Sequence, residues 1–404
     1  MGKEEAILVV DIGTTKICAL IGEEREGKLW VTGMGVVPSK GLKKGIIINI
    51  EEATLSIKSA IEKAKGQAKV NVKSVYTSIA GSHIKTVSGM GVVALKEKQV
   101  TSLEVQEVLE SAQAIELPPD RTILHVIPQE FIVDQHRGIL HPVGMTGMRL
   151  EAHVQFITAN RSVLQNLIRC FEKLNLEIEG IVFQGIASAE AVLTPEEKEL
   201  GVVLIDFGGG TTDIICFWDN VLRFVSSIPV GGELLTNDLA IGLRTSRTEA
   251  ERLKIQSGVC LKELVQDEEI VEVPGIGNRP SKKLSRKVLA EILELRVREL
   301  LELVEAELSN FGDKMKITSG LVLTGGSALI PGLIYLADQI LDLPTRIGYP
   351  PKLPGLTEEI YHPQYATAVG LLLYAYSALE TEAEVKSKGK SLWERIKELI
   401  KSKF

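Results

Sequence analysis

The most informative pattern of apolar and polar positions occurs twice, about half the chain length apart. Residues 7–10 and 202–205 are short runs rich in β-branched residues, and each leads to an aspartate. A turn of glycine and threonine follows each aspartate, and a second apolar run comes next. This order predicts a strand, a tight turn and another strand at both places. The economical explanation is two related domains, each presenting one hairpin to a shared cleft.

Helical and strand periodicities alternate through most of the remaining chain, which predicts an α/β fold. The first half contains a predicted helix over 51–65 and a capping box, Thr101 with Glu104, that opens another helix. Residues 123–133 and 151–158 have the pattern of strands, and a further helix is expected over 161–174. We therefore predict that residues 84–163 interrupt the first domain and form a small α+β subdomain.

The second half contains one long predicted helix over 285–308, with its apolar residues on a single face. The acidic stretch 265–283 before it contains glycines and prolines and predicts a loop or hairpin. Residues 366–379 are apolar but too few to cross a bilayer, so a buried helix is expected there. Apolar residues nearly vanish over 380–391, which predicts a flexible tether.

Composition places the chain among soluble globular proteins of several domains, with 404 residues, 45% hydrophobic and 25% charged. The formal net charge of −7 predicts a surface that repels nucleic acid and anionic lipid, so membrane attraction would need a local basic segment. The four cysteines are far apart and form no C-x-x-C pair, which favours a reducing cytosolic compartment. Charged residues at the start lead directly into a strand, so no signal peptide is expected.

The two hairpins have the chemistry of a phosphate site. A turn of glycine and threonine exposes backbone N–H groups and small hydroxyls to phosphate oxygens. Asp11 and Asp206, at the strand ends, could hold a hydrated Mg²⁺ beside those phosphates, and Lys16 could add a positive charge. No P-loop motif is present, which disfavours P-loop folds.

A third glycine-rich segment supports a nucleotide site. A predicted strand over 321–323 is followed by the segment 324–332, which contains a Gly-Gly turn at 325–326, and then by a predicted helix. A Gly-Gly turn at the start of a helix lets a ligand approach the backbone closely. A further glycine turn occupies 229–232. One such turn alone is weak evidence, whereas three in this order, two of them related by duplication, strongly indicate nucleotide binding.

These three motifs resemble the phosphate-1, phosphate-2 and adenosine motifs of the actin/Hsp70/sugar-kinase superfamily. Within it, the chain resembles the FtsA family of bacterial cell-division proteins over essentially its whole length. The residues that carry this resemblance form short strings spread along the chain. They are 41–46, 78–83, 128–129, 144–151, 187–189, 250–254, 286–291, 323–326 and 367–371.

The resemblance implies an actin-like duplicated ATPase fold with two facing domains, an FtsA-type extra subdomain and a C-terminal amphipathic helix, with ATP and Mg²⁺ as cofactors. It places Asp11 and Asp206 near Mg²⁺. The nucleotide-binding set that it implies is Gly13, Thr14, Thr15, Lys16, Gly208, Gly209, Gly210, Thr211, Gly231, Gly232, Glu251, Lys254, Gly325, Gly326 and Ser327. On the sequence alone, Glu251 and Lys254 would be an ordinary i,i+3 surface pair.

Gln184 stands where some superfamily members carry a catalytic carboxylate. A glutamine can orient a water molecule but cannot accept its proton, so ATP hydrolysis is expected to be slow. With Asp11 and Asp206 it completes the candidate catalytic set. The alternative is that Gln184 only caps the helix that begins near it.

The resemblance also implies a division of the chain. Residues 1–83 with 164–198 would form the first actin-like domain and 199–240 with 318–379 the second. Residues 84–163 would be the inserted subdomain, which binds other division proteins. Residues 241–317 would be the lobe that binds the C-terminal tail of the tubulin-like protein FtsZ, with Arg286 and Arg296 on its partner surface. Self-association into actin-like filaments is also implied, whereas nucleic acid is not an expected partner.

The last residues, 392–404, predict an interfacial membrane helix because one face is apolar and the other mostly basic. Lys390, Arg395 and Lys403 add to the positive charge. The alternative is a helix docked on the protein or on a partner. The residues expected at the membrane are Leu392, Trp393, Ile396, Leu399, Ile400, Phe404, Lys397 and Lys401. The expected location is the cytoplasmic face of the cell membrane at the division site.

Other functions of the superfamily remain open on the sequence. An actin-like ATPase of a pilus or secretion assembly platform would share the subdomain layout, although the tryptophan-containing tail is not expected there. A sugar or glycerol kinase would need a general-base aspartate in a substrate cleft, and no such signature is visible. An Hsp70-like chaperone would need a peptide-binding β-domain after the ATPase.

Overall fold

The computed structural model describes residues 6–277 and 279–385. The predicted membrane helix over 392–404, with all its predicted membrane-binding residues, and residues 386–391 of the predicted tether lie outside the described residues. Within the described part, no helix combines the length and the apolarity needed to cross a membrane.

The first sheet has five strands in the order β11-β6-β1-β2-β3. Its central strand β1 pairs antiparallel with β2 and parallel with β6. The strands are β1 (Ile7–Ile12), β2 (Lys16–Arg25), β3 (Lys28–Pro38), β6 (Ser74–Ile79) and β11 (Glu177–Phe183). The associated short strands and helices are β4 (Leu42–Lys43), β5 (Ile46–Ile47), α1 (Ile50–Ala68), α3 (Arg161–Glu172) and α4 (Gln184–Val192).

The second sheet repeats this arrangement in the order β14-β13-β12-β17-β18. Its central strand β12 likewise pairs antiparallel with the next strand of its hairpin and parallel with a later strand. The strands are β12 (Val202–Phe207), β13 (Thr212–Trp218), β14 (Val221–Ile228), β17 (Leu321–Thr324) and β18 (Thr345–Ile347). The predicted duplication is therefore confirmed at the level of strand order and direction.

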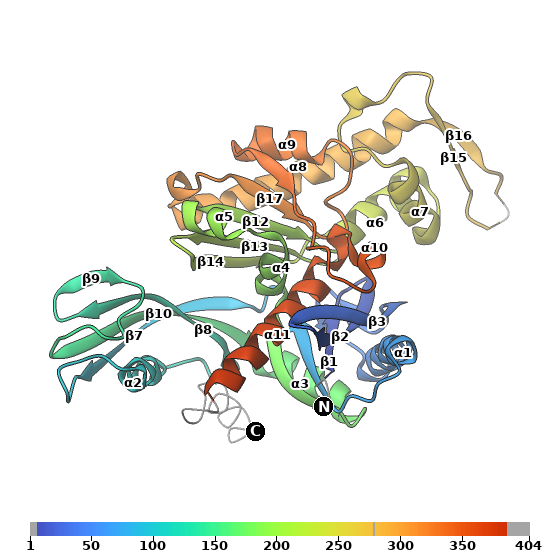
Figure 1. The fold of residues 1–404 in the computed structure, drawn as a ribbon. Coiled ribbons are helices and arrows are strands. Elements are labelled where there is room, and N and C mark those ends of the chain that lie inside the picture. Colours follow the sequence, from blue (N-terminus) through green and yellow to red (C-terminus); the bar gives the residue numbers. More distant parts are fainter. Residues whose placement is uncertain (1–5, 278, 386–404) are drawn as a thin grey trace.

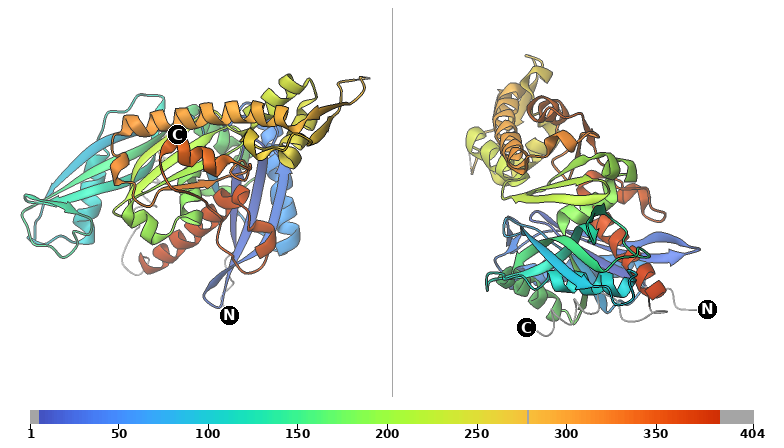
Figure 2. Two further views of the ribbon diagram at one scale, coloured as in Figure 1. Left: turned by 90° about the horizontal axis from the view of Figure 1, so that it is seen from above. Right: turned by 90° about the vertical axis from the view of Figure 1, so that its left-hand side faces the viewer.

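The long α8 packs against β14 of the second sheet and is seen lengthwise in the left view of Figure 2. Ser285 caps α8, whose apolar stripe is buried from Leu289 to Leu308, as predicted. The predicted hairpin before α8 is present as β15 and β16. The elements are α5 (Pro195–Leu200), α6 (Gly232–Leu243), α7 (Arg247–Ser257), β15 (Ile270–Val273), β16 (Lys282–Ser285), α8 (Arg286–Phe311), α9 (Leu333–Leu341) and α10 (Thr357–Ile360). Single 3₁₀ turns occupy Lys262–Leu264, Lys314–Lys316 and Pro363–Tyr365.

A third sheet, in the order β7-β10-β8-β9, forms the lobe on the left of Figure 1. It consists of β7 (Lys85–Ala94), β8 (Arg121–Val133), β9 (His136–Ile139) and β10 (Arg149–Asn160), with α2 (Ser102–Ala112) packed on it. The capping box predicted at Thr101 and Glu104 is present at the start of α2. The lobe has its own apolar core, which agrees with an α+β unit inserted into the first half.

Helix α11 (Ala366–Val385) crosses the middle of the molecule (Figure 1). Its first part is the predicted buried helix, and Ala368, Val369, Leu371 and Leu372 are fully buried. The helix also includes residues 380–385, which the sequence analysis assigned to a flexible tether. That assignment was wrong for these six residues, which continue α11; glutamate and alanine are good helix formers.

Candidate functional site

The first hairpin ends in a turn that only glycine can form without a clash. Gly13 N–H donates to the Lys16 carbonyl at 3.0 Å, which closes the turn between β1 and β2. A Cβ on Gly13 would lie 2.7 Å from that carbonyl oxygen. The turn therefore leaves Asp11 at the end of a buried strand, with Thr14 and Thr15 at the tip.

The tips of the two hairpins touch. A Cβ on Gly209 would lie 2.5 Å from Thr15 Cγ2, and a Cβ on Gly210 would lie 2.4 Å from Thr14 Oγ1. The two halves of the duplication therefore meet at their glycine and threonine turns, as the sequence predicted.

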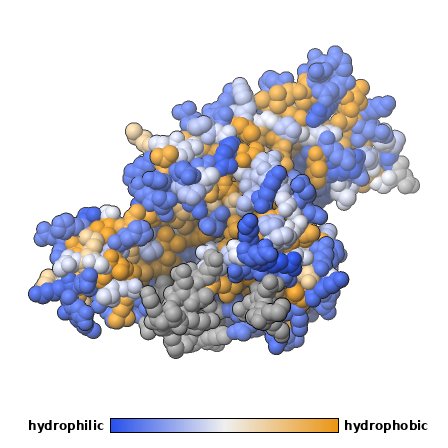
Figure 3. All heavy atoms as spheres, viewed as in Figure 1, coloured by the Kyte–Doolittle hydropathy of each residue, from blue (hydrophilic) through white to orange (hydrophobic). Residues whose placement is uncertain are grey.

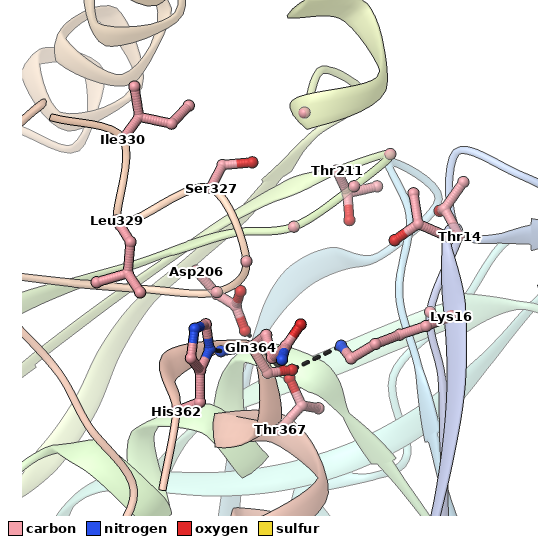
Figure 4. A pocket seen from close by; sticks show the side chains of 18 of the residues that line it. Thr14, Lys16, Asp206, Thr211, Ser327, Leu329, Ile330, His362, Gln364 and Thr367 are labelled. Atoms are coloured by element: carbon pink, nitrogen blue, oxygen red, sulfur yellow. Dashed lines mark hydrogen bonds between the residues drawn. The ribbon is translucent and has the colours of Figure 1, made fainter. Parts of the chain in front are cut away.

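A cleft of about 520 Å³ opens between these hairpins. Figure 4 shows polar side chains from both halves directed into it. The cleft is lined by Asp11, Gln184 and Asp206 and by every residue of the predicted nucleotide-binding set except Gly231. Gly231 packs against the backbone of two lining residues, because a Cβ there would be 2.6 Å from the carbonyl oxygens of Gly208 and Gly209.

Asp11 is held by two side chains from other elements. Its Oδ1 accepts hydrogen bonds from Ser78 Oγ at 2.8 Å and Gln184 Nε2 at 3.0 Å. Burial raises its pKa, and Lys16, Ser78 and Gln184 partly oppose that effect. The alternative that Gln184 only caps α4 is wrong, because Phe183 is the N-cap residue and the Gln184 amide points to Asp11 and the Ile12 carbonyl.

Asp206 is held by two hydroxyl groups. Its Oδ2 accepts from Ser188 Oγ at 2.5 Å and from Thr367 Oγ1 at 3.2 Å. Burial raises the pKa of Asp206, the Ser188 hydrogen bond lowers it, and the nearby Asp11 charge raises it. Ser188 and Thr367 lay within strings that carried the family resemblance, but the sequence analysis gave them no role.

Asp213 is a further buried carboxyl beside the site. It faces Asp206 directly across the β12–β13 ladder and accepts from Ser227 Oγ at 2.5 Å. Burial raises its pKa to about 8, so this carboxyl is mostly protonated at neutral pH. A neutral Asp213 avoids placing another negative charge against Asp206.

Lys16 bridges the first hairpin and the segment before α11. Its Nζ donates to the Gln364 carbonyl at 2.6 Å and lies 5.5 Å from the centroid of the Tyr365 ring. Burial and the Lys16 charge lower the pKa of His362, which also lines the cleft. His362 and Gln364 carried no sequence signal, because only the tertiary fold brings this segment to the hairpin.

Glu251 and Lys254 form the i,i+3 ion pair that the sequence suggested, with 2.8 Å between Nζ and Oε2, and they also line the cleft. Lys254 Nζ donates to the Gly232 carbonyl at 3.0 Å and to Thr236 Oγ1 at 2.9 Å. The ion pair therefore stands at one end of the cleft, tied to the start of α6.

Apolar residues complete the same end of the cleft. Ile255, Leu329, Ile330 and Pro331 line it, and the sequence analysis missed their roles. The segment 324–332 connects β17 to α9, which begins at Leu333, so the helix predicted after Gly332 is confirmed. The intervening turn folds back over the cleft, since Ser327 N–H donates to the Phe207 carbonyl.

The donor set fits a hydrated Mg²⁺ held next to phosphates. Mg²⁺ prefers oxygen ligands and usually takes one or two carboxylates while keeping several waters. Asp11 and Asp206 supply two carboxylates at the cleft. Among the described residues, no group of three or more His, Cys, Asp or Glu side chains is placed to hold a metal ion by itself. These residues therefore suit a cation that also binds a ligand.

Arg286 and Arg296, predicted to bind a partner, both lie on α8 and already have acidic neighbours. Arg286 pairs with Glu269 at 2.6 Å and donates to the Ser257 carbonyl. Arg296 pairs with Asp238 and Glu299, both at 2.5 Å. A partner carboxylate would have to share these guanidinium groups.

Comparisons with known proteins agree with this geometry. The family model "Cell division protein FtsA" matches residues 203–370, and the model "SHS2 domain inserted in FTSA" matches residues 81–158. The Cell division protein FtsA of Pseudomonas aeruginosa is 42% identical over 369 residues, which are 91% of this chain and 88% of the relative. That of Escherichia coli strain K12 is 37% identical over 391 residues, which are 95% and 93% of the two chains.

Solved structures share the fold at 15% sequence identity. A chain of a PilM-PilN type IV pilus biogenesis complex superposes with a TM-score of 0.65, covering 92% of this chain and 98% of that one. MreB5 of Spiroplasma citri bound to ADP gives 0.56, covering 95% and 99%. The fold is thus actin-like, and from its relatives the chain belongs to the FtsA family of cell division proteins.

Proposed function

We propose that this protein binds ATP with Mg²⁺ in the cleft, polymerises on the inner face of the cytoplasmic membrane and anchors FtsZ filaments there. The observation that carries the nucleotide assignment is the cleft itself, which both halves of the duplication build from nearly all the predicted residues. The similar fold of MreB5 from Spiroplasma citri, solved with ADP, supports the same assignment. Glycine turns would approach the phosphates, and the apolar end would take the base.

The chain's own residues would divide the work of binding. Asp11 and Asp206 would hold Mg²⁺ through water, and Mg²⁺ would neutralise phosphate charge. Lys16 would exchange the Gln364 carbonyl for a phosphate oxygen, and Glu251 would bind the ribose. Gln184 cannot accept a proton, and its side chain is engaged by Asp11 and the Ile12 carbonyl. ATP turnover would therefore be slow, and the protein would act mainly as a scaffold.

We also propose the domain division predicted from the sequence, which the three separate sheets support. The lobe over 241–317 would bind the FtsZ tail. The inserted lobe would bind other division proteins, and Figure 3 shows apolar residues on its surface. Met90, Val143 and Met148 are each more than half exposed there.

Membrane binding would depend on polymerisation. The segment 392–404 is short and would bind lipid weakly by itself, whereas several such segments in one filament would bind strongly through effective concentration. ATP-dependent assembly would therefore control attachment to the membrane at the division site, and the same filament would hold FtsZ there.

Co-sedimentation with anionic vesicles and a labelled FtsZ tail peptide tests this function. The full chain is compared, with and without Mg-ATP, with a variant that ends at Val385 and keeps all of α11. We expect the full chain to pellet with the peptide in Mg-ATP and the shortened chain to leave both in solution. Pelleting without the peptide would contradict FtsZ binding and favour another assembly platform. Equal pelleting of both chains would contradict the membrane role of the tail.

A further inference from the structure

Helix α4 contacts both aspartates of the cleft through one of its faces. Gln184 Nε2 donates to Asp11 Oδ1 at 3.0 Å, and Ser188 Oγ donates to Asp206 Oδ2 at 2.5 Å. Positions i and i+4 of a helix lie on the same face, about 6 Å apart along the axis. A single short helix therefore links the carboxylates contributed by the two halves of the protein.

Helix α11 adds a second hydroxyl to the same carboxylate oxygen. Thr367 Oγ1 lies 3.2 Å from Asp206 Oδ2 and 3.0 Å from Ser188 Oγ, so the three groups form a closed triangle. All three side chains are buried, and Ser188 has no exposed surface. Asp206 and Thr367 also line the cleft, whereas Ser188 lies behind them without exposure.

The hydrogen bonds leave one oxygen of each aspartate for a ligand. Within residues 6–277 and 279–385, the bonds to Asp11 go to Oδ1 and those to Asp206 go to Oδ2. The other oxygen of Asp206, Oδ1, faces Gly325, where a Cβ would come within 2.4 Å. Each carboxylate is thus fixed through one oxygen, which sets the direction of the other.

We propose that Ser188 and Thr367 are positioning residues that orient Asp206 for the hydrated Mg²⁺ of Mg-ATP. Gln184 holds Asp11 in the corresponding way. This inference rests on the proposed nucleotide binding and extends it to residues that contact the carboxylate rather than the nucleotide. Because a hydrated Mg²⁺ demands a nearly regular octahedral geometry, a carboxylate that can rotate binds it less well.

The alternative is that the triangle only satisfies buried hydroxyl groups and stabilises the packing of α4 against α11. The two roles differ in what magnesium does. Loss of packing would weaken nucleotide binding equally with and without Mg²⁺. Loss of the orientation of Asp206 would weaken nucleotide binding only when Mg²⁺ is present.

Equilibrium binding of a fluorescent ATP analogue to the full chain, in excess MgCl₂ and in EDTA, separates these roles. Thr367→Val removes the hydroxyl at nearly constant volume, Thr367→Ser retains it, and Ser188→Ala removes the other hydroxyl. Ser309→Ala is the matched control, because it removes an exposed hydroxyl that bonds to Glu305 on α8, away from the cleft. Urea unfolding of each variant reports folding separately.

We expect T367V and S188A to lower affinity about tenfold in MgCl₂, the size expected for a lost hydrogen bond to a charged group, and to change it little in EDTA. T367S should keep the affinity of the parent protein. Equal losses in both conditions, or no loss in either, would overturn the positioning role while leaving nucleotide binding intact. If the parent protein binds the analogue in neither condition, the proposed nucleotide function falls and the positioning role falls with it.

Discussion

At the scale of single residues, the acceptors around the Gln184 side chain fix which end of its amide faces inward, and Ser78 Oγ is one of them at 3.2 Å from Nε2. Nε2 lies 3.0 Å from Asp11 Oδ1 and 3.1 Å from the Ile12 carbonyl oxygen. Only the nitrogen end of the amide can donate to both. A glutamate at this position would face the same two oxygens without a proton to offer.

We therefore predict that Gln184→Glu destabilises the protein by about 1–3 kcal/mol at neutral pH and does not speed ATP turnover. The cause is the loss of two buried hydrogen bonds and the repulsion between two carboxylates. Urea unfolding and a steady-state phosphate-release assay measure the two effects. Gln339→Glu, on the exposed face of α9, is the control and should change stability by less than about 0.5 kcal/mol. A stable, faster Gln184→Glu variant would contradict this assignment.

His125 on β8 gives a residue-scale prediction for pH. Its Nε2 accepts the Phe183 N–H at 3.0 Å, and burial lowers its pKa to about 4. An unfolded histidine titrates near 6.5, so the unfolded chain binds the proton first as pH falls. The contribution of neutral His125 to stability is therefore complete above about pH 6.5 and is lost as pH falls toward 4.

We expect the titration of His125 to lower the free energy of unfolding by about 2 kcal/mol when the pH falls from 7.5 to 5. His83 has a pKa lowered to about 4 by burial and by Arg121, and it adds to the same trend. His125→Gln keeps an acceptor for the Phe183 N–H and should reduce the pH dependence, as measured by urea unfolding at both pH values. The exposed His141→Gln is the control, and an unchanged slope in His125→Gln would refute the assignment.

At the scale of elements, the crossing of α4 and α11 depends on one missing side chain. A Cβ on Gly370 would lie 1.7 Å from the Ala187 carbonyl oxygen. Because both helices contribute to the Asp206 triangle, this close approach connects helix packing to the geometry of the cleft. Glycine is needed here for space, since its φ angle is not in the left-handed region.

We predict that Gly370→Ala destabilises the protein by more than about 2 kcal/mol, because the helices must separate. Gly66→Ala is a matched control in the exposed part of α1, where an added Cβ would meet nothing within 4 Å. That change should stabilise the protein by up to about 1 kcal/mol through helix propensity. Thermal or urea unfolding of both variants provides the comparison, and similar effects of the two changes would contradict it.

At the scale of the whole molecule, the two halves contact each other at the tips of the two hairpins. Gly210 lies against Thr14, and Gly209 lies against Thr15. Closing the cleft on a ligand would press these two tips closer together. Any side chain at Gly210 would force the halves apart while leaving each core intact.

We therefore predict that Gly210→Ala lowers ATP affinity at least tenfold with little change in urea stability. The measurement is the shift in unfolding temperature produced by saturating Mg-ATP, which should be large for the parent protein and small for the variant. Gly66→Ala should retain the full shift. An unchanged shift in Gly210→Ala would show that the tips do not set the geometry of binding.

The sequence by itself determined the duplication, the two hairpins and the glycine-rich part of the cleft. The repeated strand, aspartate and glycine turn is a local pattern, and the backbone geometry of each turn follows from residues a few positions apart. The capping box at Thr101 and the apolar stripe of α8 were predictable for the same reason. The resemblance of short strings along the chain gave the family.

The tertiary structure decided what depends on residues far apart in the chain. Only the folded chain places His362 and Gln364 at Lys16, directs Gln184 to Asp11, and puts Ser188 and Thr367 on Asp206. Gly231 belongs to the same glycine turn as Gly232 but does not line the cleft, because a local pattern does not set which residue of a turn faces a cavity. Most of these contacts join residues more than a hundred positions apart, and packing rather than local propensity selects them.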